Sequence, residues 1–125
     1  MKIAASLLPW NVGTIPMWAA LTALEDRKGL EKRVKFNNGQ VAFIEKEMSK
    51  IPGIVVFPTR ANYVLFDAGA TGKTGEDVLK YAQKKGLILR GNKPKYGSEG
   101  WFRVTIGTSQ ENKMFIKVMK DFFSR

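Results

Sequence analysis

Residues 101–108 read WFRVTIGT, and this stretch decides the second half of the fold. The pattern alternates from Trp101 to Ile106, which places positions 101, 103 and 105 on one face of a strand and positions 102, 104 and 106 on the other. Thr108 and Glu111 form a capping box that opens a last helix. The core face of that helix is filled by Phe115, Val118, Met119 and Phe122. The stretch therefore predicts a strand with Arg103 on its polar face, followed by an amphipathic helix.

The residues before this stretch predict a helix and a further strand. Thr74 and Asp77 resemble a capping box, with Asp in place of the preferred Glu or Gln. The helix runs from about Gly75 to Lys85 and stops at Gly86, because glycine often ends helices at this position. A strand over Leu87–Arg90 follows, and the ten residues after it are a loop rich in Gly, Pro and Lys.

The first half of the chain predicts two helices. One begins near Thr14, whose hydroxyl can cap it, and breaks near Gly29. The second helix has one apolar stripe and ends at Pro52-Gly53. Asn38-Gly39 is also a strong hairpin signal, but its flanks do not alternate with period two, so a continuous helix is favoured. The stripe consists of Leu30, Val34, Val41, Ile44, Met48 and Ile51.

Two short β runs, Ile54–Phe57 and Asn62–Phe66, complete the pattern, so that the elements follow in the order ααββαββα. This order predicts an α/β (α+β) fold, in which a small mixed sheet of about four strands packs against helices. The β–α–β piece over residues 62–90 should cross over right-handed if its strands lie parallel in one sheet. We expect residues 1–13 to be a lead-in and residues 14–125 to be one domain.

Composition narrows the chemistry. The 125 residues include 21 Lys and Arg against 11 Asp and Glu, a formal charge of +10. The chain has no Cys and no His, which excludes disulfide frameworks, Cys or His metal sites and Ser-His-Asp triads. The excess charge favours anionic partners, from nucleic acid down to a single phosphate or carboxylate. No metal ligand set and no catalytic residue is predicted in this chain.

Two basic features have simpler explanations than a binding site. Gly72-Lys73-Thr74 lies where a phosphate-binding loop belongs, but Asp67 stands where that loop needs its first Gly, so a turn and a helix cap are favoured. The lysines of the two later helices favour a solvated face, because most Phe residues fall on core faces and do not interleave with them. These lysines are Lys80, Lys84, Lys85, Lys113, Lys117 and Lys120.

Arg90 and Arg103 are the candidate binding residues. Arg90 ends one predicted strand, and Arg103 lies on the polar face of the next, across a loop that can bring them together. A guanidinium group holds a carboxylate or phosphate through two parallel hydrogen bonds, a geometry that Lys cannot copy. Spacing alone leaves open that both are simply exposed strand arginines.

Five motifs, in order from about residue 7 to the end, resemble the C-terminal small domain of histidinol-phosphate aminotransferases. Pro9-Trp10-Asn11-Val12 resembles the family's Pro-aromatic-Asn-Val segment, and Pro58-Thr59-Arg60-Ala61-Asn62-Tyr63 its Pro-Ser-x-Ala-Asn-aromatic strand. Gly86-Leu87-Ile88-Leu89-Arg90 is similar to Gly-Ile-Leu-Val-Arg. Phe102-Arg103-Val104-Thr105-Ile106-Gly107-Thr108 is similar to Leu-Arg-Ile-Thr-Ile-Gly-Thr, and Glu111-Asn112 to the start of the following helix. The ordered set is far more specific than any single motif.

The resemblance implies roles for four residues. Arg103 would grip the anionic end of the substrate, a carboxylate or a phosphate, and Arg90 would assist in the same pocket. Asn62 would help to shape the hinge and the pocket side, and Asn11 would lie near the domain junction. Family members are fold-type I pyridoxal-phosphate enzymes of amino-acid biosynthesis, form homodimers, and transfer an amino group between an amino acid and a 2-oxo acid.

The same resemblance implies that essential parts are missing. The family's Schiff-base lysine, its groups that bind the cofactor phosphate and the Asp that pairs with the pyridine nitrogen lie in an upstream large domain, and no lysine here matches that motif. We therefore expect a fragment that binds no pyridoxal phosphate by itself, is inactive alone, and has the missing large domain and an anionic, amino-acid-like substrate as its partners.

Two alternatives stay open. Arg60-Ala61-Asn62-Tyr63 also resembles the threonine-phosphate decarboxylases, whereas Gly107-Thr108 favours the aminotransferases. A non-enzymatic basic module that binds nucleic acid is the alternative from another class, although nucleic acid is not the expected partner. No stretch approaches the roughly 18 to 20 apolar residues of a membrane span, so we expect no membrane partner and a cytoplasmic location.

Overall fold

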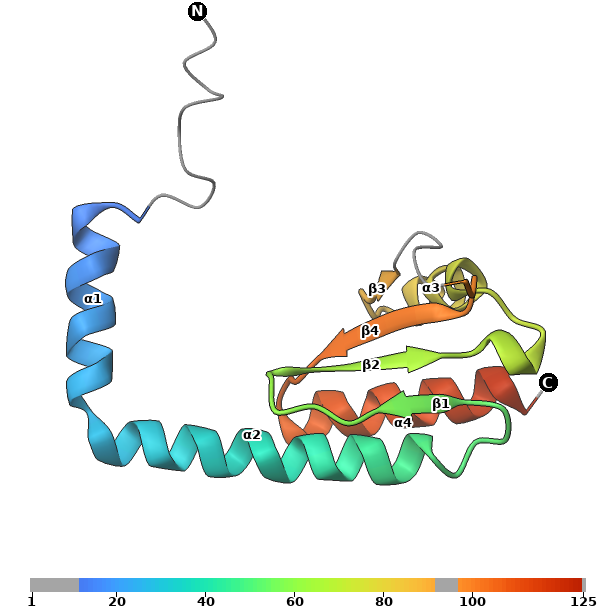
Figure 1. Ribbon diagram of the computed structural model, residues 1–125, viewed down its shortest axis with the longest axis horizontal. Helices are drawn as coiled ribbons and strands as arrows, with labels where there is room; N and C mark the ends of the chain where they lie inside the picture. Colours follow the sequence, from blue (N-terminus) through green and yellow to red (C-terminus); the bar gives the residue numbers. More distant parts are fainter. Residues whose placement is uncertain (1–11, 92–96, 125) are drawn as a thin grey trace, which may run out of the picture. The chain divides into compact units, whose positions relative to one another are not determined.

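The computed structural model describes residues 12–91 and 97–124, which form four α-helices and a four-stranded sheet (Figure 1). The predicted element order, the α/β class and the strand count are confirmed. The helices are α1 (Thr14–Glu25), α2 (Arg27–Met48), α3 (Gly75–Lys84) and α4 (Ser109–Phe123). The strands are β1 (Val55–Phe57), β2 (Tyr63–Asp67), β3 (Arg90–Gly91) and β4 (Trp101–Thr105), and a short 3-10 helix, η2 (Gly69–Thr71), follows β2.

The chain divides into two compact units, Met1–Lys35 and Phe36–Arg125, and α2 runs through both. The first unit contains α1 and the start of α2. The second contains the sheet, α3, α4 and the rest of α2. Within the described residues, no helix has the length and apolar content needed to cross a membrane.

The strands lie in the order β1-β2-β4-β3, and each neighbouring pair is antiparallel. In the central pair, Val64 lies opposite Val104. Because β2 and β3 are both antiparallel to β4, they run in the same direction with β4 between them. The connection through α3 therefore joins two strands that are not neighbours, so that the sheet, predicted to be mixed, contains antiparallel pairs only among the described strands.

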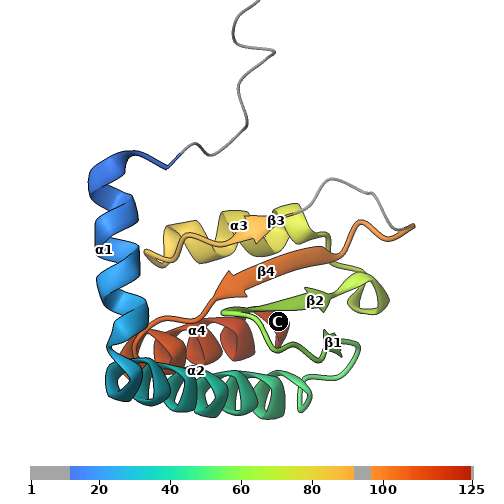
Figure 2. The same cartoon turned by 60° about the vertical axis from the view of Figure 1, so that its left-hand side comes forward.

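The core forms where α2, α3 and α4 meet one face of the sheet (Figure 2). Alternation along β2 and β4 turns Val64, Phe66, Phe102 and Val104 into this core. The Phe66 ring stacks on the Phe102 ring, with 5.0 Å between their centres. The helices contribute apolar side chains at helical spacing, namely Val41, Ile44, Met48, Val78, Ala82, Phe115, Val118, Met119 and Phe122.

The break between the first two helices comes at Asp26, so the prediction near Gly29 is wrong by three residues. The Asp26 carboxylate accepts a hydrogen bond from the Gly29 N–H at 2.9 Å, so a side-chain cap starts α2 before the glycine. Thr14 does not cap α1, because Gly13 occupies the cap position and no side chain bonds there. The continuous helix through Asn38-Gly39 is confirmed.

The strand predicted over Leu87–Arg90 exists, but its predicted bounds are wrong, because β3 comprises Arg90 and Gly91 only. Before Arg90 the chain leaves the edge of β4. Leu89 turns into the core, and the Ile88 side chain is 95% exposed. A β-rich sequence alone does not show whether a neighbouring strand stays within hydrogen-bonding distance.

Candidate functional site

Arg90 and Arg103 lie directly opposite each other on the antiparallel strands β3 and β4. Residues that face each other across such a ladder project from the same face of the sheet, with Cβ atoms roughly 4.5–5.5 Å apart. Since Phe102 and Val104 point into the core, both arginines project from the opposite face. The sheet thus brings together two arginines that have twelve residues between them in the sequence.

This arginine pair has no acidic partner within residues 12–91 and 97–124. The ion pairs found there involve Arg33, Lys50, Lys80 and Lys120 as the cations. Like charges directly opposite each other on a ladder repel. An added anion would relieve that repulsion, and each guanidinium group offers it two parallel N–H bonds. The arrangement is therefore able to bind a carboxylate or a phosphate.

Arg103 does have an aromatic neighbour. Its guanidinium carbon lies 5.0 Å from the centre of the Tyr63 ring. Tyr63 pairs with Thr105, and Leu65 pairs with Arg103, so the ring reaches Arg103 across one diagonal of the ladder. The sequence analysis missed this contact, because it depends on the register between two strands that are far apart in the chain.

The two asparagines that the resemblance singled out are not part of this arrangement. Asn62 is exposed just before β2, and its backbone carbonyl accepts a hydrogen bond from the Ile106 N–H at 2.8 Å. That pairing lies three ladder positions from the Leu65–Arg103 pair. Asn11 lies outside the described residues. The roles suggested for both asparagines stay predictions.

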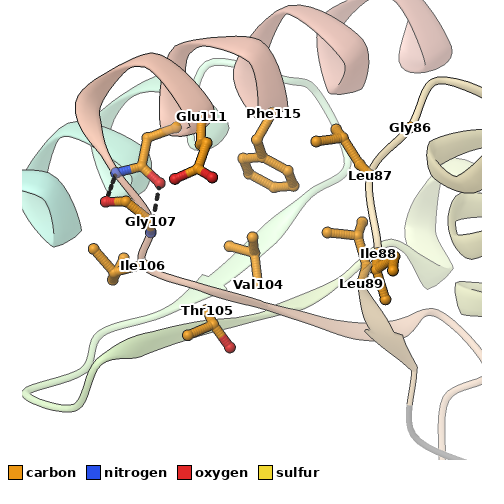
Figure 3. A pocket seen from close by; sticks show the side chains of 11 residues that line it. Gly86, Leu87, Ile88, Leu89, Val104, Thr105, Ile106, Gly107, Glu111 and Phe115 are labelled. Carbon is orange, nitrogen blue, oxygen red and sulfur yellow. Dashed lines mark hydrogen bonds between the residues drawn. The ribbon is translucent and has the colours of Figure 1, made fainter.

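A hollow of about 390 Å³ opens between residues 86–89, the end of β4 and the start of α4 (Figure 3). Neither arginine lines it. The Glu111 carboxylate, which belongs to a lining residue, accepts hydrogen bonds from the backbone and the hydroxyl of Thr108, and these bonds lower the pKa of Glu111. The buried Asn112 side chain bonds to Gln40 at 2.9 Å and to the backbone of Gly107. Because these polar groups are already paired, the hollow offers an apolar wall and little chemistry.

Gly72-Lys73-Thr74 forms a turn and a helix cap, as predicted. Gly72 adopts a left-handed φ of 73°, which favours glycine. The Thr74 hydroxyl accepts from the Asp77 N–H at 3.1 Å, and the Asp77 carboxylate accepts from the Thr74 N–H at 3.0 Å. The Asp77 carboxylate also accepts from the Thr74 hydroxyl at 2.7 Å, and the bonds that this carboxylate accepts, the one from the hydroxyl first, lower the pKa of Asp77. The chain's own carboxylate thus occupies the helix end where a phosphate would bind.

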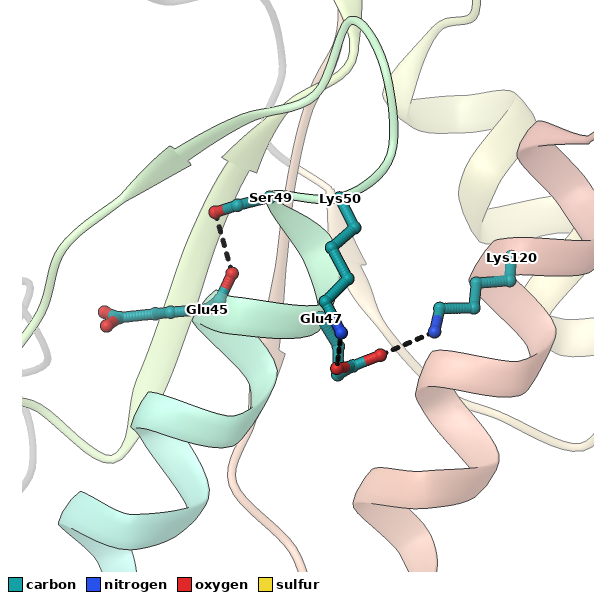
Figure 4. A network of polar contacts seen from close by, with 5 residues as sticks. All are labelled: Glu45, Glu47, Ser49, Lys50 and Lys120. Carbon is teal, nitrogen blue, oxygen red and sulfur yellow. Dashed lines mark hydrogen bonds and ion pairs between the residues drawn. The ribbon is translucent and has the colours of Figure 1, made fainter.

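Of the six lysines predicted on the two later helices, two are held in ion pairs, and Lys85 lies just after the end of α3. The Glu47 carboxylate binds both Lys50 and Lys120, and so joins the end of α2 to α4 (Figure 4). Lys80 pairs with Glu76 at 2.8 Å. The remaining four are exposed, namely Lys84, Lys85, Lys113 and Lys117.

Known proteins were compared with this chain. No family model matches it. It is similar to the histidinol-phosphate aminotransferase of Methanococcoides burtonii, 33% identical over 122 residues, which are 97% of this chain and 31% of that protein. It is also similar to the histidinol-phosphate aminotransferase of Maricaulis maris, 32% identical over 115 residues, which are 91% of this chain and 31% of that protein.

Solved structures show the same relationship. The histidinol-phosphate aminotransferase from Clostridium acetobutylicum matches with a TM-score of 0.79 and 25% identity, over 98% of this chain and 37% of that chain. The L-threonine-O-3-phosphate decarboxylase from Porphyromonas gingivalis shares the fold, with a TM-score of 0.73 and 20% identity, over 98% of this chain and 38% of that chain.

The chain spans about 30% of the length of the curated relatives that it matches. The match nevertheless extends over nearly all of the chain itself. By sequence and by fold, the chain is homologous to the C-terminal part of the histidinol-phosphate aminotransferases.

Proposed function

We propose that residues 14–125 are the small domain of a pyridoxal-phosphate-dependent aminotransferase of the histidinol-phosphate kind, and that Arg103 and Arg90 bind the anionic end of its substrate. The observation that carries this proposal is the position of Arg90 directly opposite Arg103, with no acidic partner for either among the described residues. The names of the relatives support the reaction class.

The two arginines act by binding and orientation. A guanidinium fork fixes the angle as well as the position of a carboxylate or phosphate, because two parallel hydrogen bonds must form together. A second positive charge from Arg90 suits a doubly charged phosphate. A substrate held by its anionic end presents its amino group in one orientation, and orientation alone contributes substantially to rate.

The described residues do not fit pyridoxal phosphate itself. This cofactor requires a lysine amine for its imine and protein groups that orient its ring. Neither the strands that carry the arginines nor the lining of the hollow contains a lysine. We therefore assign no chemical step to the cofactor in this chain. The cofactor site and the homodimer contacts belong to the missing large domain, and the 125-residue chain alone is expected to be inactive.

Product analysis tests the reaction class. The full-length enzyme that contains this chain is incubated with pyridoxal phosphate, histidinol phosphate and a 2-oxo acid. Amino transfer forms a new amino acid from the 2-oxo acid, and this product is measured by chromatography. Absence of that product with histidinol phosphate and with other phosphorylated amino donors would contradict the proposal.

A threonine-phosphate decarboxylase is the second candidate, because an enzyme of that name shares the fold over 98% of the chain. Both kinds of enzyme handle amino compounds with a phosphate group, so an arginine pair suits either. Threonine phosphate supplied to the full-length enzyme separates them, since decarboxylation releases carbon dioxide without forming a new amino acid from the 2-oxo acid.

A further inference from the structure

We infer that Tyr63 is a positioning residue for the anion site: its ring holds the Arg103 guanidinium from one face and leaves the N–H edge free for a carboxylate or phosphate. The inference rests on the proposed function, because it takes Arg103 as the anion-binding group.

The contact has the geometry of a cation–π interaction. The guanidinium carbon lies 5.0 Å from the ring centre, inside the limit of about 6 Å for such pairs. A planar guanidinium stacks on an aromatic ring through its flat face, whereas its hydrogen bonds point outward in its own plane. The ring can therefore support Arg103 without using its hydrogen-bond donors.

An acidic partner would have the opposite effect. A carboxylate would occupy the N–H groups of Arg103 and compete with any anionic ligand. Two described lysines do have such partners, in the Lys80–Glu76 and Lys120–Glu47 ion pairs. Arg103 instead has an electron-rich ring beside it, which stabilises the positive charge without neutralising it.

Arg103 also needs support, because Arg90 lies directly opposite and repels it. Both members of the Tyr63–Arg103 contact are fixed by backbone, since β2 and β4 pair continuously from the Tyr63–Thr105 pair to the Asp67–Trp101 pair. A guanidinium group that is already held in place loses less conformational freedom when an anion binds. The ring therefore increases affinity for the anion without contacting it.

The experiment uses the 125-residue chain and inorganic phosphate as the probe. NMR titration follows the Nε–Hε signal of Arg103, which Arg103→Gln identifies by removing it. In the wild type this signal is expected to show a ring-current shift. Tyr63→Phe keeps the ring and should keep both the shift and the phosphate affinity. Tyr63→Leu should lose the shift and bind phosphate about two- to fivefold more weakly, as expected for an exposed cation–π contact.

Phe57→Leu is the matched control. Phe57 lies opposite Leu65, which in turn lies opposite Arg103, so all three side chains project from the same face of the sheet. The Phe57 ring stacks on the Trp101 ring, with 4.8 Å between their centres, and not on a cation. Its replacement should leave phosphate affinity unchanged. If Tyr63→Leu does not give the dispersed NMR spectrum of a folded chain, Tyr63→Val is used in its place, because valine has a high strand propensity.

Each outcome decides a separate point. Wild-type affinity in Tyr63→Leu overturns the inference and leaves the anion site intact. If Tyr63→Phe loses as much phosphate affinity as Tyr63→Leu, the effect belongs to the hydroxyl. If Phe57→Leu loses as much, the effect belongs to the apolar surface of this face of the sheet. Either result overturns the inference. A wild-type chain that binds no phosphate overturns the anion site itself, and the inference with it.

Discussion

The contribution of Arg103 to substrate binding can be divided into its positive charge and the geometry of its guanidinium group, because different substitutions remove one or both. In the full-length enzyme, Arg103→Ala should lower kcat/KM by an amount equivalent to about 2–5 kcal/mol of transition-state binding. Arg103→Lys keeps the charge but not the fork, so it should recover only part of this loss. The absorbance of the bound cofactor should stay unchanged, because no cofactor contact is assigned to Arg103. Steady-state kinetics that match the wild type would refute the assignment.

Glu47 makes the stability of the chain depend on pH. Hydrogen bonds from Lys120, and then from Lys50, lower the pKa of Glu47 from its ordinary value of 4.5 to about 2. The unfolded chain takes up a proton near pH 4.5, whereas the folded chain keeps this carboxylate ionised down to about pH 2. The stabilising contribution of Glu47 is therefore complete above about pH 5 and is lost as the pH falls toward 2.

Urea unfolding of the wild type and of Glu47→Gln, at several pH values, measures this contribution. The variant should be less stable at pH 7, and the difference should shrink as the pH falls from 5 to 2.5. A difference that stays constant over that range would mean that Glu47 does not act through its charge.

At the same scale, the sequence predicts both arginines of the proposed anion site and misses the aromatic ring beside Arg103. Arg90 and Arg103 could be named as a pair because each belongs to a short, recognisable segment of strand. Tyr63 could not be linked to Arg103 in the same way, since the contact needs the register of β2 on β4. Cross-strand register follows from packing of the whole sheet and is not written in either strand alone.

Among the elements, α2 contains a position where stability should be easy to gain. Gly39 lies within the helix, is exposed, and has no atom within 4 Å of the place where a Cβ would stand. Glycine in a helix costs roughly 0.5–1 kcal/mol relative to alanine, because it loses more backbone freedom on folding. Gly39→Ala should therefore raise the free energy of unfolding by about that amount in urea titrations. A decrease would contradict the exposed position of Gly39 within a continuous helix.

The first residue of α3 should behave in the opposite way. The Gly75 N–H bonds to the Glu99 carbonyl at 2.7 Å, and a Cβ at position 75 would collide with the backbone carbonyl oxygen of Trp101. Backbone cannot move aside as a side-chain end can. Gly75→Ala should therefore lower the free energy of unfolding by roughly 1–3 kcal/mol, as overpacking does in cores. Equal stability of variant and wild type would show that the start of α3 shifts freely.

The helices were easier to predict than the strands, and β3 shows why. Capping boxes at Thr74 and Thr108 are local signals, and both form as predicted. The segment before Arg90 is rich in β-forming residues, yet it leaves β4, and the hollow opens between the two. Strand pairing requires a partner at the right distance, which depends on how α3 and α4 pack and not on the strand's own residues.

For the molecule as a whole, all buried apolar residues of the core cluster lie at or after Val41. The described part of the first unit, residues 12–35, contributes none of them. In α1 no residue is buried, and Ile15, Trp18 and Leu24 are each more than half exposed. A helix that is apolar on all sides is normally packed against other parts of a protein. The exposure of α1 is therefore consistent with a chain that spans only part of its relatives.

This distribution predicts that the second unit carries the stability of the chain. Removing residues 1–34 should change the free energy of unfolding by no more than roughly 1 kcal/mol, because none of the described residues among them is buried. Met48→Ala is the matched comparison, since Met48 is fully buried in the core cluster, and its truncation should cost about 2–5 kcal/mol. Urea unfolding followed by circular dichroism measures both. If the shortened chain loses as much free energy of unfolding as Met48→Ala, the prediction is wrong. Burial within the second unit would then be insufficient to stabilise the sheet, and the first unit would contribute to the stability of the fold.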